Sequence, residues 1–489
     1  MKRPFLSLLS CTLGFLATAP HSLAIDAKGL LRVNTTIQTY SISQPWELTP
    51  PKRRRGLGAV LESGKILTTA EMAANSTYIE FESADGTHTV PATVIAIDYE
   101  TNLALLGPEE GANADWILKL GTLKTNGPVG IGDEVDIWQL EDNGDAVRTV
   151  GTVRSVDLLS TFASGHYFLS YEVKASMQSA TSSYTLPITL NGNLLGILTS
   201  YNSKDQISDV VAPEIVKIFL DDVKDGNYEG FPSLGIATVL TEDSNFRKWL
   251  GLKDEQGGLY VSRVLPGSGA DESGLKKGDV ILTVDGHPID RRGYYKDESY
   301  GRLFWSHLVR GSRKVGERLS LVILREGKEQ TLKAVLRRPP PKLIPSHMYD
   351  KAPPFLIKGG LVFQELTRSY LEAFGKEWQS RAPLNLLDAL NNPEDYEEGR
   401  DRLVFLSRVI RTPATIGYDR VANLIVTEAN GQKVTDMNSL VTALKDPKDG
   451  LHSIRIDDIP YVLYLDPQLS DSVDKTLLER GLPSLQRLP

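Results

Sequence analysis

The stretch Gly258–Ile289 constrains the fold of this chain more than any other part of its sequence. Residues Leu259–Val264 alternate apolar and polar side chains, as a half-buried strand does, and the glycine-rich turn that follows ends the strand. Ala270–Leu275 is expected to form a short helical turn, and Val280–Val284 a second strand that closes at Asp285-Gly286. The stretch therefore predicts a small, sheet-based unit.

The same residues resemble a known family. Val264–Ser268, followed by the run Gly274–Leu282 and by Asp285-Gly286, resembles the PDZ domains of the HtrA/Deg protease family. A nucleotide-binding loop was the alternative, because Gly269 and Gly274 have the spacing of a phosphate-binding loop. The residues that follow lack the required Lys and Ser or Thr pair, so a structural turn is favoured and no cofactor is expected.

Length and the N-terminal segment suggest an exported, multidomain protein. The 489 residues are too many for one core and suggest about three domains. Residues 1–24 are expected to be a secretory signal, with Lys2 and Arg3 as its charged start, Phe5–Ala17 as its apolar run and Ser22-Leu23-Ala24 as its cleavage site. No later apolar run is long enough to span a bilayer, so no integral membrane segment is expected.

Charge and cysteine content exclude two classes of function. Loss of Lys2 and Arg3 would take the formal charge from −8 to about −10, which disfavours nucleic acid as a partner. Cys11 is the only cysteine and lies in the expected signal, so the mature chain is expected to have neither a disulfide nor a thiol nucleophile.

From Gly56 to Ser200 the segments are short, β-branched and separated by turn residues, which predicts an all-β domain of many strands. Gly58–Ala70 resembles the first barrel of an HtrA-type, trypsin-like domain, in which the next residue is the catalytic histidine; here that residue is Glu71. Ala92–Leu106 resembles the segment that carries the family's orienting aspartate, and the residue at that place is Asn102.

The nucleophile's place follows by counting back from Leu190–Ile197, which resembles the strand pair after the family's serine loop. The count falls on Ser183, and the glycines that surround the serine in the family are absent. Thr181 stands where a glycine would form part of the oxyanion hole, and a β-branched residue reaches that conformation only with strain. A serine needs a neighbouring base to attack, and a carboxylate and an amide replace the histidine and aspartate poorly.

Other catalytic or metal sites find little support. Lys174 could in principle act as a base for Ser183, but the sequence gives no geometry for such a pair. The histidines of the mature chain have no spacing that suits zinc, so no metal is expected: His88, His166, His287, His307, His347 and His452.

Two segments before and after the all-β region have simple interpretations. The basic run Lys52–Arg55 is expected to be a solvated loop, with contact to an anionic lipid surface as the alternative. Pro213–Val223 is predicted to be a helix, because Val216, Phe219, Leu220 and Val223 fall on one face at helical spacing, and it matches the family's linker helix.

The first predicted PDZ domain has a candidate peptide site. The residues Ser233, Leu234, Gly235 and Ile236 resemble the family's carboxylate-binding loop, which is followed by a strand at Ile236–Leu240 that could pair with a peptide. Tyr300–Gly311 is predicted to be the helix beside this groove. Its Phe304, His307 and Leu308 would face either the ligand or the core. Arg318–Arg325 and Glu329–Leu336 are predicted to form a hairpin, and Arg337–Pro341 a stiff linker.

From Lys342 the chain resembles the second PDZ-like domain of the plant-type, two-PDZ Deg branch. Gly360–Phe363 lies where a carboxylate loop would be, with a buried structural strand as the alternative. Pro383–Leu390 is predicted to be a helix, and Glu394–Asp401 a charged surface loop. The tail around Arg480–Ser484 resembles the plant-type tail or is disordered.

Together these features predict a mostly β fold with α+β modules: a trypsin-like double β-barrel followed by two PDZ or PDZ-like domains. The expected units are a signal (1–24), a degenerate protease domain with a linker helix (25–225), a PDZ domain (226–341), a second PDZ-like domain (342–475) and a tail (476–489). The resemblance implies trimer-based homo-oligomers and a periplasmic or envelope location if the protein is bacterial.

The favoured function is a catalytically inactive protease homologue that binds peptide C-termini or unfolded proteins in quality control. The alternatives are an active serine endopeptidase that uses Ser183, and a regulatory subunit of an active Deg protease.

Overall fold

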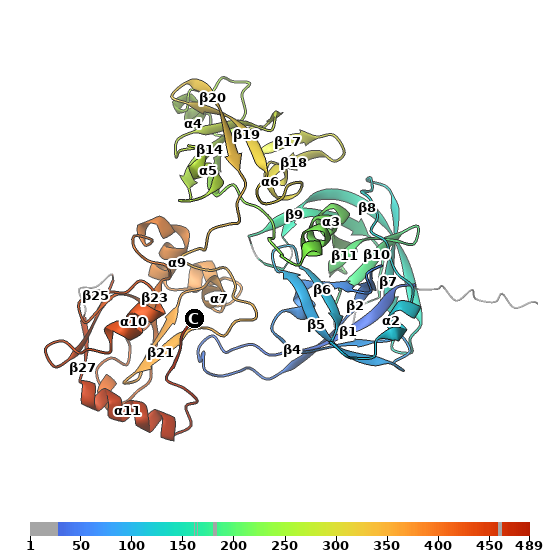
Figure 1. Ribbon diagram of the computed structural model, residues 1–489. Coiled ribbons are helices and arrows are strands. Elements are labelled where there is room, and N and C mark those ends of the chain that lie inside the picture. The colour runs from blue at the N-terminus through green and yellow to red at the C-terminus, as the bar shows by residue number, and fades with distance from the viewer. Residues whose placement is uncertain (1–27, 161, 164, 179–182, 458–461) are drawn as a thin grey trace, which may run out of the picture.

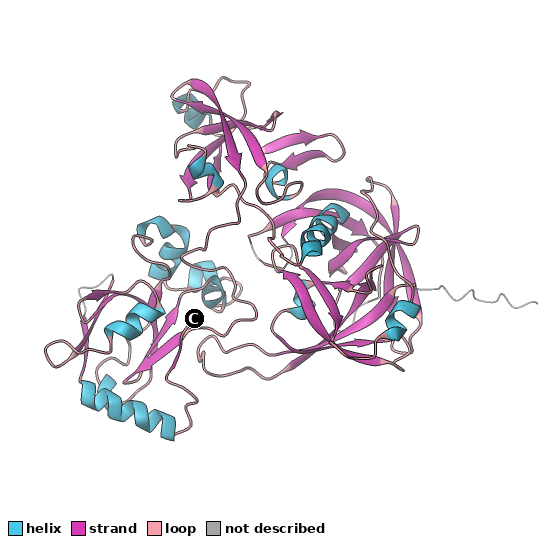
Figure 2. Cartoon of the chain, in the orientation of Figure 1, coloured by secondary structure: helices cyan, strands magenta, loops and turns pink. Residues whose placement is uncertain are grey.

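The computed structural model describes residues 28–160, 162–163, 165–178, 183–457 and 462–489. The expected signal residues and Thr181 lie outside these ranges. Strands predominate, and the chain forms two barrels followed by two larger sheets and a two-stranded one (Figures 1 and 2). The predicted mostly β class, with a double barrel at its start, is confirmed.

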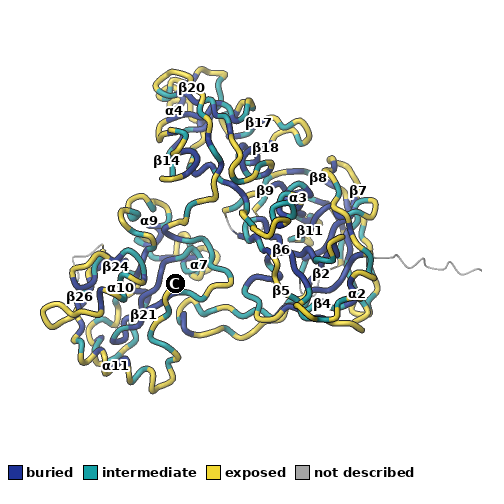
Figure 3. The backbone as a smooth tube through the Cα atoms, in the orientation of Figure 1, coloured by how far each residue is buried: buried dark blue, intermediate teal, exposed yellow. Residues whose placement is uncertain are grey.

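The first barrel is closed and antiparallel, with strand order β1-β2-β3-β6-β5-β4. Apolar side chains such as Leu31, Val33 and Phe81 fill it. Figure 3 colours the backbone by burial, and much of these strands is buried. Its elements are β1 (Leu30–Ile37), β2 (Lys52–Val60), β3 (Ile66–Thr68), α1 (Ala70–Ala73), β4 (Ser76–Glu82), β5 (Thr89–Asp98) and β6 (Leu103–Pro108).

The basic run Lys52–Arg55 is not the loop that the sequence suggested. It forms the first half of β2 and pairs with β1 from Asn34 to Ile37. Exposed guanidinium groups can occupy a strand here because acidic partners lie at the barrel rim. Arg55, for example, forms ion pairs with Glu82 at 3.6 Å and with Asp142 at 3.3 Å.

The second barrel is also closed, with strand order β10-β11-β12-β9-β8-β7. The predicted linker helix after it is confirmed. Val216, Phe219 and Val223 are buried, whereas Leu220 of the same predicted face is only partly buried. The elements are α2 (Asp115–Lys119), β7 (Glu134–Leu140), β8 (Ala146–Ser160), β9 (Tyr167–Lys174), β10 (Leu186–Leu190), β11 (Asn193–Asn202), β12 (Ile207–Val211), α3 (Pro213–Asp222) and the 3-10 turn η1 (Val223–Asp225).

The first predicted PDZ domain contains a sheet of order β13-β14-β15-β19-β20, with β16 beside β15 and a separate hairpin, β17–β18. The strands predicted at 236–240, 259–264, 280–284 and 318–325 are all present. The elements are β13 (Ile236–Leu240), α4 (Ser244–Trp249), β14 (Leu259–Val264), α5 (Gly269–Glu272), β15 (Val280–Val284), β16 (His287–Pro288), β17 (Tyr294–Asp297), β18 (Gly301–Phe304), α6 (His307–Arg310), β19 (Arg318–Arg325) and β20 (Lys328–Val335).

The helix predicted for Tyr300–Gly311 is wrong in its first half. Gly301 has φ +79°, a left-handed conformation that closes the β17–β18 turn and that a helix cannot include. The Asp297 carboxylate accepts hydrogen bonds from the N–H groups of Ser299 and Tyr300 and stabilises the same turn. Only α6 remains helical.

The second predicted PDZ-like domain has a sheet of order β27-β26-β24-β23-β22-β21-β28, with β25 beside β24. The helix predicted at 383–390 is confirmed as α9. The elements are β21 (Phe355–Lys358), β22 (Leu361–Glu365), α7 (Arg368–Glu372), α8 (Trp378–Arg381), α9 (Leu384–Asn391), η2 (Pro393–Asp395), β23 (Val404–Val409), η3 (Pro413–Thr415), β24 (Leu424–Ala429), β25 (Gln432–Lys433), α10 (Met437–Ala443), β26 (His452–Ile456), β27 (Val462–Leu465), α11 (Pro467–Glu479) and β28 (Gln486–Arg487).

The C-terminal tail is ordered. Helix α11 continues across the predicted boundary at 475/476, and β28 adds to the sheet beside β21. The β1–β2 loop of the first barrel reaches this part of the second PDZ-like domain (Figure 1). Trp46 packs there against Phe355 with ring centroids 5.8 Å apart, and Arg487 donates to the Pro45 carbonyl at 3.0 Å.

Candidate functional site

The residues at the family's histidine and aspartate places lie together in the first barrel. Glu71 is in α1, and Asn102 lies in the turn between β5 and β6 with φ +60°, which asparagine tolerates better than most residues. The backbone N–H of Glu71 donates to Asn102 Oδ1 at 2.9 Å. Asn102 therefore positions the backbone of α1 at Glu71.

The Glu71 carboxylate has a cationic partner that the sequence analysis missed. Arg54 Nη1 lies 3.2 Å from Glu71 Oε1 and donates to the Glu71 carbonyl at 2.6 Å. The basic run that contains Arg54 was the only signal in the sequence, and its strand conformation was not predicted. The ion pair places the Arg54 guanidinium beside the Glu71 carboxylate, at the position predicted for the family's histidine.

Ser183 forms its hydrogen bonds with a threonine. Its hydroxyl donates to Thr185 Oγ1 at 3.0 Å and accepts the Thr185 N–H at 3.1 Å. Thr185 Oγ1 lies 2.8 Å from Thr69 Oγ1. This buried contact connects the two barrels, and Thr69 is two residues before Glu71 in the sequence. Within the described ranges no hydrogen bond joins Ser183 to Glu71 or Asn102.

The described histidines lie in other surroundings. His166 is 3.2 Å from Arg310 Nη1 and 3.4 Å from Glu100 Oε2, where burial and the Arg310 charge lower its pKa to about 3. Contacts elsewhere hold three more: His88 with Thr87, His347 with Glu372, and His452 with Asn430. Across the described part of the chain no cluster of His, Cys, Asp and Glu has a geometry that could hold a metal ion.

The predicted carboxylate loop is held firmly by its own domain. Gly235 has φ +77°, and a Cβ added there would come within 2.2 Å of Ser268 Cβ, so glycine is required for this approach. The Gly235 N–H donates to Ser233 Oγ at 3.0 Å, and the Ser233 N–H donates to the Arg337 carbonyl at 2.8 Å. Leu234 is buried.

The strand after this loop has an open edge. Among the described strands β13 pairs only with β14. Because the Leu265 N–H donates to the Gly235 carbonyl, Ile236 and Val264 face each other without exchanging hydrogen bonds, and the Ile236 N–H and C=O point away from β14. A peptide strand could therefore be added along β13.

Thr238 continues this edge beyond a β-bulge. The Val261 N–H donates to Asp279, so Tyr260 does not exchange hydrogen bonds with its partner in β15 and turns its backbone groups toward Val239 in β13. Since backbone groups alternate in direction along a strand, the neighbouring Thr238 N–H points to the open edge.

The side chains proposed to line the groove are largely core residues. His307 and Leu308 are 8% and 9% exposed, and burial lowers the pKa of His307. Phe304 packs against Tyr294 with ring centroids 5.6 Å apart.

In the second PDZ-like domain, β22 is wholly buried and lies between β21 and β23. Gly360–Phe363 therefore leads into an interior strand, in agreement with the alternative of a buried structural strand.

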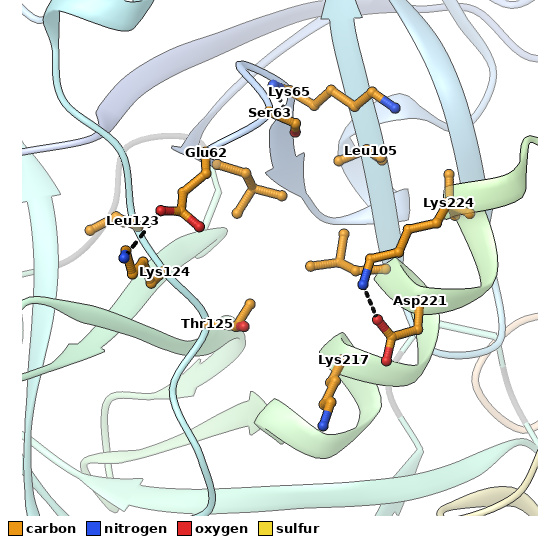
Figure 4. A pocket seen from close by; sticks show the side chains of 13 residues that line it. Glu62, Ser63, Lys65, Leu105, Leu123, Lys124, Thr125, Lys217, Asp221 and Lys224 are labelled. Atoms are coloured by element: carbon orange, nitrogen blue, oxygen red, sulfur yellow. Dashed lines mark hydrogen bonds and ion pairs between the residues drawn. The ribbon is translucent and has the colours of Figure 1, made fainter.

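Two cavities lie on the double barrel. Ser183 lines one of about 460 Å³, together with Arg55 and Asp142. The other, of about 340 Å³, lies between the first barrel and α3 and is lined by none of the predicted site residues. In Figure 4 its charged side chains form two ion pairs on opposite sides, Glu62 with Lys124 at 3.3 Å and Asp221 with Lys224 at 2.5 Å.

None of the helices in the described ranges has the length and apolar character needed to cross a membrane.

Two segments of the chain match a family described as PDZ domain, at residues 232–336 and 344–481. The chain is 27% identical to "Protease Do-like 4, mitochondrial" of Arabidopsis thaliana, over 86% of this chain and 77% of that protein. It is 26% identical to "Protease Do-like 2, chloroplastic" of the same plant, over 93% and 74%. "Periplasmic serine endoprotease DegP" of Escherichia coli (strain K12) is 26% identical, over 58% and 57%.

Among solved structures, "HtrA-type protease AlgW with decapeptide" aligns with a TM-score of 0.47 at 22% identity, over 64% of this chain and 97% of that one. The two plant relatives align with most of this chain. The chain therefore has two PDZ domains and is homologous to the Deg/HtrA serine proteases.

Proposed function

We propose that this chain is an exported Deg/HtrA homologue that does not hydrolyse peptides and that binds the C-termini of peptides or unfolded proteins in quality control of the cell envelope. The observation that carries the proposal is the hydrogen bonding of Ser183. Its hydroxyl donates to Thr185, which is not a base, at 3.0 Å.

Hydrolysis by a serine requires a group that takes the hydroxyl proton and then gives it to the leaving amine. Glu71 occupies the histidine's place, and its carboxylate is paired with Arg54 at 3.2 Å. A carboxylate cannot replace imidazole well in this shuttle, because it is a weaker base near neutral pH. The contacts of Asn102 with the α1 backbone support the same conclusion.

Peptide binding is supported by β13 and the loop before it. The open edge offers the backbone groups of Ile236 and Thr238, which can pair with an extended peptide. Gly235 brings this loop close to Ser268 and fixes where the strand begins. We therefore place the terminal carboxylate of a ligand near Ser233–Ile236.

Export and assembly complete the proposal. Lys2, Arg3 and the cleavage pattern Ser22-Leu23-Ala24 support export, and Edman sequencing of protein from a periplasmic fraction should begin at Ile25. Trimer-based assembly stays an expectation from the family, which analytical ultracentrifugation of the mature chain would test.

The test of inactivity uses the full mature chain with a fluorophosphonate probe and with casein, beside an active HtrA protease. We expect neither labelling of Ser183 nor casein turnover above the level of a Ser183→Ala variant. Labelling that disappears in Ser183→Ala, together with turnover, would show an active endopeptidase. Copurification with an active Deg protease, with no peptide binding by the isolated chain, would favour the regulatory subunit.

The test of peptide binding uses a peptide with an apolar C-terminal residue and the same peptide amidated at its C-terminus. We expect binding only to the free carboxylate form. Thr238→Pro removes an N–H at the open edge, where proline is tolerated, and is expected to weaken binding about five- to tenfold. The matched variant Thr238→Ala keeps the N–H and should bind as the wild type does. Equal binding by all three proteins would exclude β13 as the ligand strand.

A further inference from the structure

A segment at the start of the second PDZ domain lies across the junction of the two barrels. The ring of Tyr349 stacks with two aromatic rings, one from each barrel. Tyr99 of the first barrel is 4.5 Å away with an interplanar angle of 28°, and Phe162 of the second barrel is 4.8 Å away at 24°. Stacking at these separations is a favourable arrangement for aromatic side chains.

The next residue makes polar contacts with the same part of the first barrel. The Asp350 carboxylate accepts the backbone N–H of Asn75 at 2.5 Å, and the Asn75 side chain accepts the Asp350 N–H at 2.9 Å. The Tyr99 hydroxyl also donates to Asp350. Two consecutive residues therefore make an aromatic contact and a reciprocal pair of hydrogen bonds, which is a recognition pattern for one short sequence.

These contacts lie beside the candidate catalytic residues. Asn75 follows α1, which carries Glu71, and Tyr99 begins the turn that carries Asn102. The segment is held from its own domain as well. The His347 ring lies nearly parallel to that of Tyr349, with centroids 5.5 Å apart and an interplanar angle of 7°, and its Nε2 is 3.1 Å from Glu372 Oε2. The segment thus covers one approach to the junction between the barrels.

We propose that Asn75, Tyr99 and Phe162 form a binding slot for a short peptide segment in which an aromatic residue precedes an acidic one, and that Tyr349-Asp350 of the chain itself occupies this slot as a latch. The segment turns at Asp350, which has φ +54°. The latch connects the second PDZ domain to the barrels. Because Asp350 is exposed, its contacts are open to exchange with a segment of the same chemistry. The inference goes beyond the proposed function, since it requires neither hydrolysis nor binding along β13.

The test is a competition in trans on the full chain. A fluorescent peptide with the sequence of residues 345–353 is titrated against the wild type and against Tyr349→Ala/Asp350→Ala, whose own latch is lost. Fluorescence anisotropy should show at least tenfold tighter binding to the double variant. A peptide with Tyr and Asp exchanged for Ala should bind neither protein.

Further variants separate opening of the latch from damage to the fold. Tyr349→Phe keeps the ring and should behave as the wild type, whereas Asn75→Ala alters the slot itself and should weaken peptide binding in the double-variant background. The control Tyr464→Ala changes an exposed tyrosine of the same domain and should leave the latch closed. Circular dichroism checks that each variant is folded.

A second measurement does not depend on affinity for the free peptide. Hydrogen exchange of residues 70–76 and 97–102 should be faster in the double variant than in the wild type and unchanged in Tyr464→Ala. If a folded double variant shows neither tighter peptide binding nor faster exchange in these segments, the latch proposal is wrong.

Discussion

At the junction of the barrels, the hydroxyls of Ser183, Thr185 and Thr69 form a chain of short contacts, of 3.0 and 2.8 Å. The contact between Thr185 and Thr69 is buried, so a base that took the place of Thr185 would leave the Thr69 hydroxyl without this partner. An unsatisfied buried polar group costs about 1–3 kcal/mol. This network therefore stabilises the present arrangement of Ser183 against the rearrangement that catalysis would need.

Gly235 gives the most direct single-residue prediction. Gly235→Ala adds a Cβ in a left-handed conformation, at a distance of 2.2 Å from Ser268 Cβ. Left-handed strain costs about 1–2 kcal/mol for a residue with a Cβ, and relief of the clash must shift the loop. We expect loss of peptide binding and a lower melting temperature of the first PDZ domain, measured by calorimetry on the full chain.

The variant Ser268→Gly separates the clash with Ser268 from the left-handed strain at residue 235. It removes the atom that the new Cβ would meet and leaves the strain in place. The double variant Gly235→Ala/Ser268→Gly should therefore recover part of the melting temperature that Gly235→Ala loses. If Gly235→Ala has the stability of the wild type, the loop does not have the tight approach described here.

Single residues also show the limit of what could be predicted. The family resemblance assigns Glu71 and Asn102 to one site. In the structure Glu71 follows β3, Asn102 precedes the neighbouring strand β6, and the two residues are in contact. The pairing of Arg54 with Glu71 depends on a strand that starts earlier than its apolar pattern suggests. No periodic pattern in the sequence predicts that Thr185 is the hydrogen-bond partner of Ser183.

Among elements, strands were predicted more reliably than the helix beside the groove. Alternation at Leu259–Val264 and Val280–Val284 is local information, and both strands have the predicted bounds. The region Tyr300–Gly311 contains apolar residues at helical spacing, but its outcome is decided by the turn at Gly301 and by the packing of Phe304 on Tyr294. Tertiary contacts and turn chemistry outweighed periodicity there.

The small strand β28 provides a prediction at this scale. Its Arg487 donates to the Pro45 carbonyl at 3.0 Å, and its guanidinium lies 4.4 Å from the ring centroid of Tyr40. Arg487→Ala removes both contacts, worth about 1–2 kcal/mol together. We expect faster hydrogen exchange in the β1–β2 loop, residues 38–51, by about five- to thirtyfold.

The control for this variant is Arg480→Ala, which removes an exposed arginine at the end of α11. Substitutions at such surface positions usually change stability by less than about 0.5 kcal/mol, so exchange in the loop should stay at the wild-type rate. Equal rates in both variants would mean that β28 does not anchor the loop.

At the scale of the whole molecule, the domains meet through contacts between residues far apart in sequence. Trp46 packs on Phe355, Arg263 pairs with Glu397 at 2.6 Å, and Tyr171 contacts Tyr300 through hydroxyls 3.1 Å apart. The domain order followed from local patterns and from the family resemblance. The interfaces between domains could not be predicted in this way, because a local pattern does not indicate which surface of one domain meets which surface of another.

The contact between the second barrel and α6 gives the last prediction, a dependence on pH. His166 touches Arg310 of α6, and burial together with the Arg310 charge lowers the pKa of His166 from 6.5 to about 3. Lys342 and His347 lower this pKa further, and Asp98 raises it, while Glu100 lies 3.4 Å away. The folded state therefore keeps His166 neutral where the unfolded state already binds a proton.

Between pH about 3 and 6.5 the unfolded chain binds more protons at this position, so stability rises with pH in that window and falls on acidification. The slope is about 1.4 kcal/mol per pH unit, which gives at most about 2 kcal/mol between pH 6.5 and 5.0. His166→Gln cannot gain the charge and should lose less stability over this range in calorimetric scans. His88→Gln, at an exposed site of the first barrel, should follow the wild type. If His166→Gln also follows it, the histidine already carries its proton in the folded state, and the contact between the second barrel and α6 tolerates that charge.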